Sequence, residues 1–395
     1  MRDSTSKFQG YIMKKTLAAL AVLGAFAGTA AAADVTLYGV VDTGLAYTYK
    51  NTELATDIAD LTDGSESQFG MQSGYNAVSR FGLKGTEDLG NGLKVGFKLE
   101  NGFSSDDGNF KYDGRLFGRE ASLSLMSEFG TLSFGRMGGV ASSAGTYDIV
   151  YATADAFDGG DNDVFGMHSS SRYDNMVTYQ SPKFAGVQGT VQYSFKQDNK
   201  STSDTGAEGT SKVNRYASFA LTGDFGPLQT VAAYELTKYA NTKDAHDETH
   251  AFYLGGNYDF QVLKLFAMAQ YTKAAKDFGT LEDPLSVFFG NAAGTEKGID
   301  SYGLHLGTIV PAFGGDFTAA VYYVDGETDT IANVVSADAT YLGFSARYVY
   351  PLSKRTSIYA GAGYAEEKTD INVDVFSESF KNKVGQAYAG ITHTF

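Results

Sequence analysis

The feature that most constrains this chain is a two-residue alternation of apolar and polar side chains. In VTLYGVVDTGL, Val35, Leu37 and Val41 have one parity, and Thr36 and Asp42 have the other. Successive side chains of a β-strand point to opposite faces, so the alternation predicts strands with one apolar and one polar face. Runs such as LKVGFKLENGF, YASFALTG and YLGFSARYVY repeat it, and no stretch of similar strength has a 3.6-residue period. We therefore predict an all-β fold.

Two kinds of connection alternate between the predicted strands. Short ones cover 87–92, 127–130, 181–186, 223–227, 310–316 and 351–355. Long polar ones cover 50–76, 104–114, 137–171, 197–213, 240–249, 274–298, 326–338 and 367–382. Eight long connections separated by short turns predict about sixteen antiparallel strands in up-and-down order. No internal boundary is evident, so these strands form one predicted domain.

Strands of this kind fit either of two architectures. A sandwich or propeller buries the apolar faces inside, whereas a transmembrane barrel turns them toward lipid and encloses a polar, water-filled lumen. Arg, Lys and Glu lie in the middle of the polar faces, and Tyr and Phe gather near strand ends, where a membrane–water interface favours them. Closure also pairs every strand edge in lipid. We predict a 16-stranded antiparallel transmembrane β-barrel.

The N-terminal region has the parts of an export signal. The segment MKKTLAALAVLGAFAGTAAAA, from Met13, has two lysines, an apolar stretch and an alanine-rich cleavage site. Its apolar stretch is shorter than the roughly 20 residues of a membrane-spanning helix. We predict that 1–33 is an upstream extension plus a cleaved signal peptide and that 34–395 is the barrel. Residues 1–12 fit no export signal, so translation starts at either Met1 or Met13.

Charge and cysteine content exclude several classes of protein. The chain has 31 basic and 46 acidic residues, a net charge of −15 and no Cys. The predicted leader holds four basic residues and one acidic residue, so the mature net charge is −18. A nucleic-acid binder is usually basic, so we expect no nucleic-acid partner. Without Cys there is no disulfide framework and no thiolate metal site.

Apparent metal and catalytic motifs lack the spacing that their chemistry requires. HDETH, which contains His246 and His250, departs from the order H-E-x-x-H and lies in a polar loop. ADAFDGGDNDVF lacks the spacing and closing Glu of an EF-hand. No Ser–His pair suits a barrel hydrolase. We therefore predict no enzyme, no metal site and no cofactor.

Six blocks of sequence carry a family resemblance. They are VTLYGVVDTGL, SRFGLKGTEDLGNGLKVGFKLENGF, FGREASLSLMSEFGTLSFGR, RYDNMVTYQSPKFAG, YPLSKRTSIYAGAGY and YAGITHTF. In this order and spacing the chain resembles the Gram-negative general porins, in particular the trimeric type common in beta-proteobacteria. The resemblance implies a homotrimer in outer-membrane lipid through which ions and small hydrophilic solutes diffuse passively. It also implies that the long third loop folds into the lumen.

The resemblance further implies a basic wall that faces this loop across a constriction. Motif position places Arg80, Arg119 and Arg172 on the wall, and parity adds Lys84 beside Arg80. Parity alone leaves Arg119 ambiguous, because its face also carries apolar residues.

The third long connection, 137–171, supplies the acidic side of the predicted constriction. It carries five Asp residues and no Lys or Arg, and we select Asp148, Asp155 and Asp158. Some family members have a further basic residue beside LYG, where this chain has Val40. With the net charge of −18, this predicts weak or cation-leaning selectivity.

Two other functions remain open from the sequence. A substrate-specific outer-membrane channel would show a lumenal row of aromatic residues, and inward-reading Tyr38, Phe266 and Tyr341 are scattered. A surface-exposed adhesin or phage-binding barrel is permitted by the long loops.

The chain ends on a strand pattern, AYAGITHTF. Ala389 and Ile391 share the outward parity with Phe395. We predict that this strand pairs with the first strand and closes the barrel. A terminal Phe resembles the signal read by the barrel assembly machinery, which we expect as a partner.

Overall fold

The structure is a computed structural model that describes residues 34–55, 64–201, 204–241, 247–278, 281–282, 298–331, 335–373 and 376–395. The predicted leader and His246 lie outside the described residues. No helix within the described ranges is long and apolar enough to cross a membrane.

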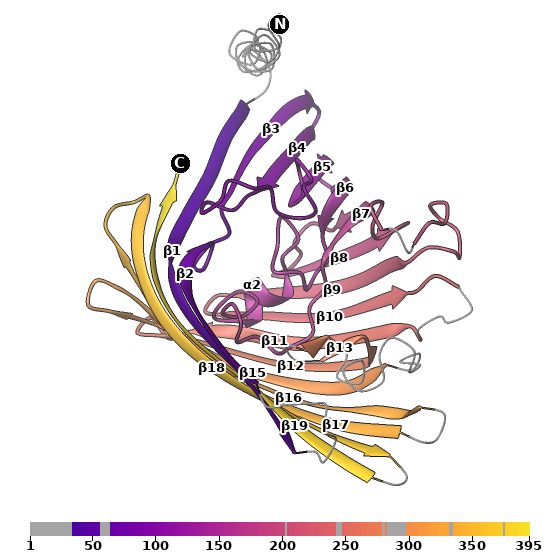
Figure 1. Cartoon of the computed structure of the whole chain (residues 1–395). Coiled ribbons are helices and arrows are strands. Elements are labelled where there is room, and N and C mark those ends of the chain that lie inside the picture. The colour runs from indigo at the N-terminus through magenta and orange to yellow at the C-terminus, as the bar shows by residue number, and fades with distance from the viewer. Residues whose placement is uncertain are drawn as a thin grey trace, which may run out of the picture.

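Antiparallel strands make up most of the described chain (Figure 1). They are β1 (Asp34–Ala55), β2 (Gly64–Ser73), β3 (Arg80–Gly90), β4 (Leu93–Gly102), β5 (Glu120–Ser127), β6 (Gly130–Gly138), β7 (Arg172–Gln180), β8 (Val187–Ser194), β9 (Arg215–Phe225), β10 (Leu228–Lys238), β11 (Thr249–Asp259), β12 (Lys264–Ala275), β15 (Ile299–Ala312), β16 (Gly315–Ile331), β17 (Val335–Pro351), β18 (Thr356–Val373) and β19 (Phe376–Thr394). A helix, α2 (Val150–Ala154), follows β6, and a small hairpin of β13 (Asp277–Phe278) and β14 (Leu281–Glu282) follows β12.

In the described part of the chain the strands close into a barrel with sixteen strand positions. Each strand from β3 to β19 pairs with its neighbours in chain order, apart from the separate hairpin of β13 and β14. β1 closes the ring by pairing with β19 along one edge, and β2 and β3 pair with successive stretches of its other edge. Because β2 and β3 lie end to end, they occupy a single strand position of the barrel, which is interrupted at residues 74–79. The predicted 16-stranded antiparallel barrel is confirmed.

The faces of the strands are arranged as a transmembrane barrel requires. On β1, Leu37 and Leu45 point outward and are 53% and 50% exposed, whereas Asp42 and Ala46 point inward and are buried. On the opposite side of the barrel, Leu254 and Leu306 also lie exposed on the outer face. A soluble sandwich would bury such side chains. The outward apolar band is therefore the surface that lipid covers.

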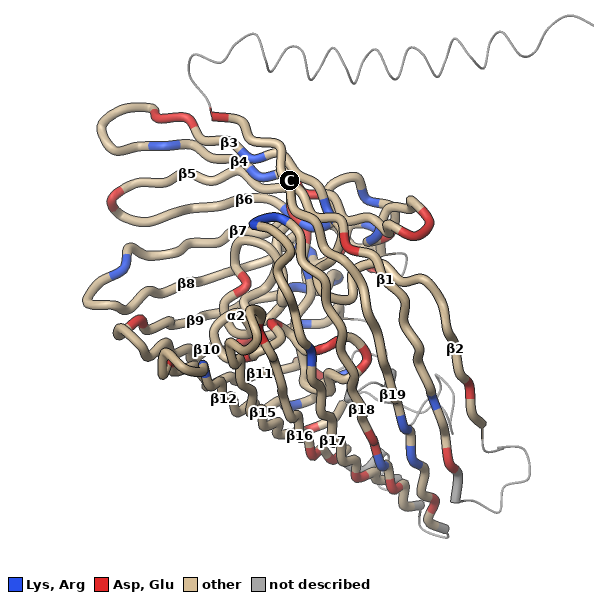
Figure 2. Tube along the Cα trace, turned by 90° about the vertical axis from the view of Figure 1, so that its left-hand side faces the viewer, with Lys and Arg blue, Asp and Glu red and all other residues tan. Residues whose placement is uncertain are grey.

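The strands are longer than the sequence predicts at the rim opposite the short turns. The stretches 50–55, 64–73 and 367–373 were expected in loops, yet they continue the hydrogen-bonded ladder. Figure 2 shows acidic and basic residues along these strand ends and few in the middle of the same strands. Apolar alternation stops where lipid ends, but the ladder needs no lipid and continues into water. Sequence polarity thus underestimates the strand lengths.

The last residue takes part in closure. Phe395 and Gly39 exchange backbone hydrogen bonds of 3.0 and 3.1 Å. A Cβ added to Gly39 would lie 2.3 Å from Cζ of Phe395 and 2.7 Å from the carbonyl oxygen of Arg80. The terminal ring therefore lies directly over the glycine, and the first and last strands fit only because residue 39 has no side chain.

We predict that Gly39→Val lowers the yield of folded barrel, because overpacking of this kind costs about 1–3 kcal/mol. The difference in gel mobility between unheated and heated samples measures the folded fraction. Gly70→Val on β2 is the matched control, since a Cβ there meets nothing within 4 Å. Equal folded fractions for the two variants would contradict the role of Phe395 in closure.

Candidate functional site

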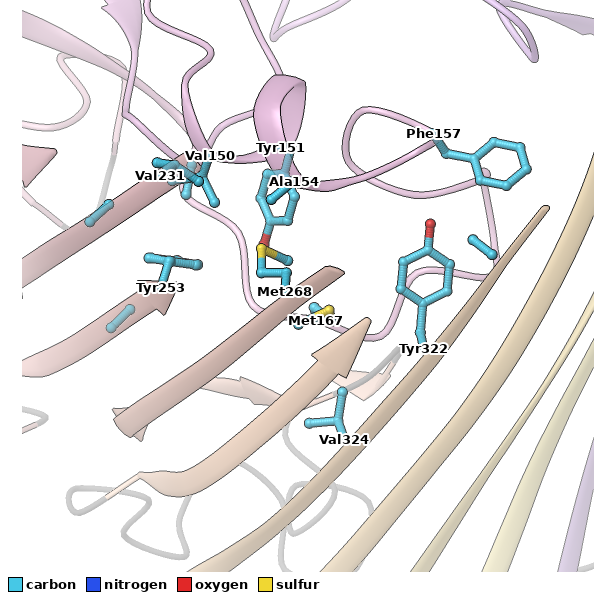
Figure 3. Close-up of a cluster of buried hydrophobic side chains, with 14 of the residues drawn as sticks. Val150, Tyr151, Ala154, Phe157, Met167, Val231, Tyr253, Met268, Tyr322 and Val324 are labelled. Carbon is cyan, nitrogen blue, oxygen red and sulfur yellow. The ribbon is translucent and has the colours of Figure 1, made fainter. Parts of the chain in front are cut away.

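Residues 139–171, here called the third loop, fold into the barrel between β6 and β7. Figure 1 shows α2 inside the ring of strands. The apolar side of the loop, including Val150, Tyr151 and Ala154, is fully buried. It packs on inward residues of β10 to β16 (Figure 3), among them Val231, Tyr253, Met268, Tyr322 and Val324. This part of the inner wall is apolar because the loop covers it.

Asp155 anchors the loop to the wall. Its carboxylate accepts backbone N–H groups of Phe157, Gly159 and Gly160 at 2.8–3.0 Å. It also accepts the Tyr322 hydroxyl at 3.0 Å, and His305 Nε2 lies 3.3 Å away. Asp155 is 3% exposed, so its oxygens are occupied by the anchor and do not line open water.

Two more carboxylates, one on the loop and one on the wall, hold the loop through tyrosine hydroxyls. Asp161 accepts the Tyr388 hydroxyl at 2.7 Å, and Arg347 lies 3.8 Å from it. Glu235 of β10 accepts the Tyr216 hydroxyl at 2.5 Å and the backbone N–H of Ala141 at 3.1 Å. Both carboxylates are buried. Burial raises the pKa of Asp161, against the opposing effects of Tyr388 and Arg347.

A second inward segment supports the tip of the third loop. Residues 74–79 lie against β1 and β19. They form the interruption between β2 and β3. The Tyr75 ring packs 4.9 Å from that of Tyr388, and Asn162 of the loop donates to the Tyr75 carbonyl at 3.2 Å. Ser79 exchanges hydrogen bonds of 3.0 Å with the backbone of Asp42. No pattern in the sequence predicts this support.

The predicted arginines gather on the wall at β3, β5 and β7. Arg119 Nε bonds Glu100 at 2.6 Å, and its Nη1 donates to the Tyr112 hydroxyl at 3.0 Å. Arg172 stacks over the same ring, 4.5 Å from its centroid. Arg80 completes the group, and its charge and that of Arg119 act on each other. Tyr112, with the left-handed φ of 59°, is thus a platform for cations that parity could not reveal.

Asp148 and Asp158 of the third loop lie close enough to these arginines for their charges to interact. The charge of Arg172 acts on Asp148, and that of Arg80 acts on Asp158. Burial raises the pKa of Asp148 to about 8, and the Asp158 carboxylate acts in the same direction. Two carboxyl groups at close range cannot both ionise freely. Near neutral pH the pair therefore holds one proton.

Three predicted site residues lie away from this group of arginines. Asp155 is buried against β15 and β16, as described above, away from the arginines. Lys84 lies four residues along β3 from Arg80, about 13 Å toward the short-turn rim, and its ammonium is 5.1 Å from the centroid of the Tyr38 ring. Phe395 lies at the closing seam.

Arg119 is inside the lumen although its parity pairs it with Leu123 and Leu125, which are exposed on the outer face. The strand β5 begins only at Glu120, and Arg119 precedes it where the chain still turns inward. The alternation does not apply before the first ladder residue, so the motif position was the better guide.

Further charges on the wall neutralise one another. Asp174 pairs with Arg136 at 2.6 Å and with Arg115 at 3.1 Å. Lys98 pairs with Glu120 at 2.9 Å. In the described residues Arg80 and Arg172 make no salt bridge, so of the arginines around Tyr112 they are the ones that can act across the lumen.

Comparison with known proteins identifies the family. A family model described as Gram-negative porin matches residues 18–370. An outer membrane porin protein of Bordetella pertussis is 36% identical over 411 residues, which cover 97% of this chain and 100% of that protein. Outer membrane porin protein 32 of Delftia acidovorans is 32% identical over 361 residues, 90% of each chain. A solved anion-selective porin from Comamonas acidovorans is 26% identical, with a TM-score of 0.60 over 92% of this chain and 100% of that one.

The chain therefore belongs to the Gram-negative porin family. It is an outer-membrane β-barrel that forms a channel for passive diffusion of small solutes. The resemblance, the fold class and the location predicted from sequence are confirmed.

We predict that preference for cations increases as pH rises through about 8, because Asp148 is neutral below its raised pKa and negative above it. Arg172 and Asp158 are the charged groups that face it. A full charge at 4 Å in water is worth about 1 kcal/mol, or roughly fivefold in permeability ratio, as an upper bound. Reversal potentials in a KCl gradient across planar bilayers measure the ratio from about pH 6.5 to about 9. The step should vanish in Asp148→Asn, and a step of unchanged size in that variant would refute the assignment.

Proposed function

We propose that the third loop and the arginine wall form the constriction of this porin. Arg80 and Arg172 supply its basic side, and Asp148 and Asp158 supply its acidic side. The observation that carries the proposal is that an inward-folded loop brings two acids within electrostatic range of two arginines that make no salt bridge in the described residues. Opposed charges across a narrow lumen give anions and cations separate lanes and orient dipolar solutes. Asp155 is left out of this set and serves as a loop anchor.

We propose weak or cation-leaning selectivity. Most wall cations are neutralised locally: Arg119 by Glu100, Arg136 by Asp174 and Lys98 by Glu120. Arg80 and Arg172 remain, and they act on the pair Asp148 and Asp158. This pair carries one negative charge near neutral pH and two above the pKa of Asp148, about 8.

The porin from Comamonas acidovorans is anion-selective, so the proposal gives the two proteins different ion selectivity. At position 40 the inward side chain is Val40, directly across from Arg80 in the register. It is 7% exposed and adds no positive charge beside the wall.

We propose that the channel assembles as a homotrimer in outer-membrane lipid. Among the described residues β2 is paired along one edge, to β1. On its outward face, Phe69 and Met71 are 71% and 58% exposed. An unpaired strand edge and exposed apolar side chains form a surface on which another chain can dock, and a neighbouring subunit would cover both. The mass of the unheated complex in mild detergent measures this, and a monomer would reject it.

The proposal also covers export, assembly and the absence of catalysis. Residues 13–33 direct export, and cleavage leaves 34–395 as the mature barrel. The terminal Phe395 is the signal for the barrel assembly machinery. The protein has no catalytic function. A substrate-specific channel and an adhesin or phage-binding barrel stay as alternatives, and no contact among the described residues favours either.

The proposed constriction is tested by removing its two free cations. We predict that Arg80→Gln with Arg172→Gln shifts the reversal potential in a KCl gradient toward cations, by up to about fivefold in the permeability ratio. Arg355→Gln, in the exposed turn before β18, is the matched control and should leave the potential unchanged. An unchanged potential in the double variant would show that these arginines do not line the narrowest part.

A further inference from the structure

A second polar recess lies in the lumen on the short-turn side of the arginine wall. Its volume is about 740 Å³, and inward faces of β1, β3, β4, β5 and β6 line it together with Thr146 and Tyr147 of the third loop. We call it the lysine recess, after Lys84, Lys94 and Lys98. The constriction does not use it, and it contains Lys84, which the structure separates from the arginines.

Most charges of the recess cancel. Glu120 pairs with Lys98 at 2.9 Å and also accepts the Thr146 hydroxyl at 2.7 Å. The Glu120 carboxylate is buried, and Lys98 and Thr146 already occupy its oxygens. Lys94 lies directly opposite Asp88 across β3 and β4, and this places opposite charges side by side.

Lys84 is the cation that remains. In the register it lies between Thr36 of β1 and Lys98 of β4. The nearby carboxylates of Glu120 and Glu100 are paired with Lys98 and Arg119, so neither is left to neutralise Lys84. Within the described residues Lys84 makes no salt bridge, and its contact is the face of the Tyr38 ring. Its side chain is exposed to the lumen.

The one acid near Lys84 without a described partner is Asp34, at the exposed rim. Cleavage after Ala33, as proposed above, gives Asp34 an α-ammonium group that balances its carboxylate. Lys84 then gives the recess a net positive charge.

Hydroxyl and amide groups surround this charge. Thr86 follows Lys84 on the same inward face, and Thr131 and Gln180 line the recess from β6 and β7. Thr86 and Thr131 make no side-chain hydrogen bond among the described residues and are free to bond a solute. One cation beside several neutral hydrogen-bonding groups matches one carboxylate on a carbon chain that carries hydroxyls. A dianion would have to lie beside the surrounding acids as well.

We propose that the lysine recess is a transit subsite for small hydroxylated carboxylates, such as sugar acids, with Lys84 binding the carboxylate and Thr86 and Thr131 bonding hydroxyls. The inference rests on the proposed function, because it places the subsite on the path of solutes that have crossed the constriction. It extends that function by naming a class of solute that the channel favours.

Biionic reversal potentials test the proposal, with potassium gluconate on one side of the bilayer and KCl on the other. They give the permeability of gluconate relative to chloride. Lys84→Gln should lower this ratio, because Lys84 holds gluconate against the hydroxyl groups of the recess whereas chloride passes it singly; about fivefold, the effect of one charge at 4 Å in water, is the upper bound, and Lys84→Arg should retain the ratio. Lys354→Gln, in the exposed turn between β17 and β18, is the control and should leave it unchanged.

A second pair of measurements isolates the hydroxyl contacts. Thr86→Val with Thr131→Val should lower the gluconate ratio and leave the ratio for propionate, which has no hydroxyl, unchanged. Equal losses for gluconate and propionate would overturn the proposed solute class. No change in gluconate permeability in Lys84→Gln would overturn the subsite itself.

The two proposals fail in different ways. If Arg80→Gln with Arg172→Gln leaves the KCl potential unchanged while Lys84→Gln lowers gluconate permeability, the constriction is misplaced and the recess stands. The reverse pattern rejects the recess and keeps the constriction.

Discussion

The rest of this structure depends on the need to pair every backbone N–H and C=O group that lies in lipid. An open sheet would leave two edges without partners, at a cost of several kcal/mol per group. The chain meets the requirement by pairing β1 with β19 over residues 40–55 and by ending within that pairing. Phe395 still exchanges two backbone hydrogen bonds with Gly39, so the strand pattern at the C-terminus is the closing seam of the barrel.

A closed barrel of this size has a lumen that side chains alone do not fill. The third loop fills part of it, and three buried carboxylates fix the loop in place: Asp155, Asp161 and Glu235. Each accepts at least one tyrosine hydroxyl of the wall. A buried carboxylate is costly without such partners, so each anchor favours one position of the loop. That position holds Asp148 and Asp158 within electrostatic range of Arg172 and Arg80, and the selectivity that we propose depends on anchors that do not touch the solute.

The sequence predicted the barrel well because alternation and turn spacing are local properties. It identified Leu37 and Leu45 as outward and Asp42 as inward, and its resemblance to a family brought Arg80, Arg119 and Arg172 to one wall. It could not separate Asp155 from Asp148, because both are acids on one loop and their difference lies in the strands they meet. It also missed Tyr112, Glu100 and residues 74–79, whose roles come from contacts between distant segments. Strand ends were underestimated because polarity marks the lipid boundary and not the end of the ladder.

The most direct test of the account is a disulfide between the third loop and the wall, in a chain that has no Cys of its own. A Cβ added to Gly343 of β17 would lie 3.0 Å from Cγ1 of the buried Val164, within reach of a disulfide. We predict that Val164→Cys with Gly343→Cys cross-links under mild oxidation and that single-channel conductance stays the same. Val164→Cys with Gly70→Cys is the control that should not cross-link. A folded barrel in which the first pair stays reduced, or whose conductance falls when it oxidises, would contradict a loop already fixed against the wall.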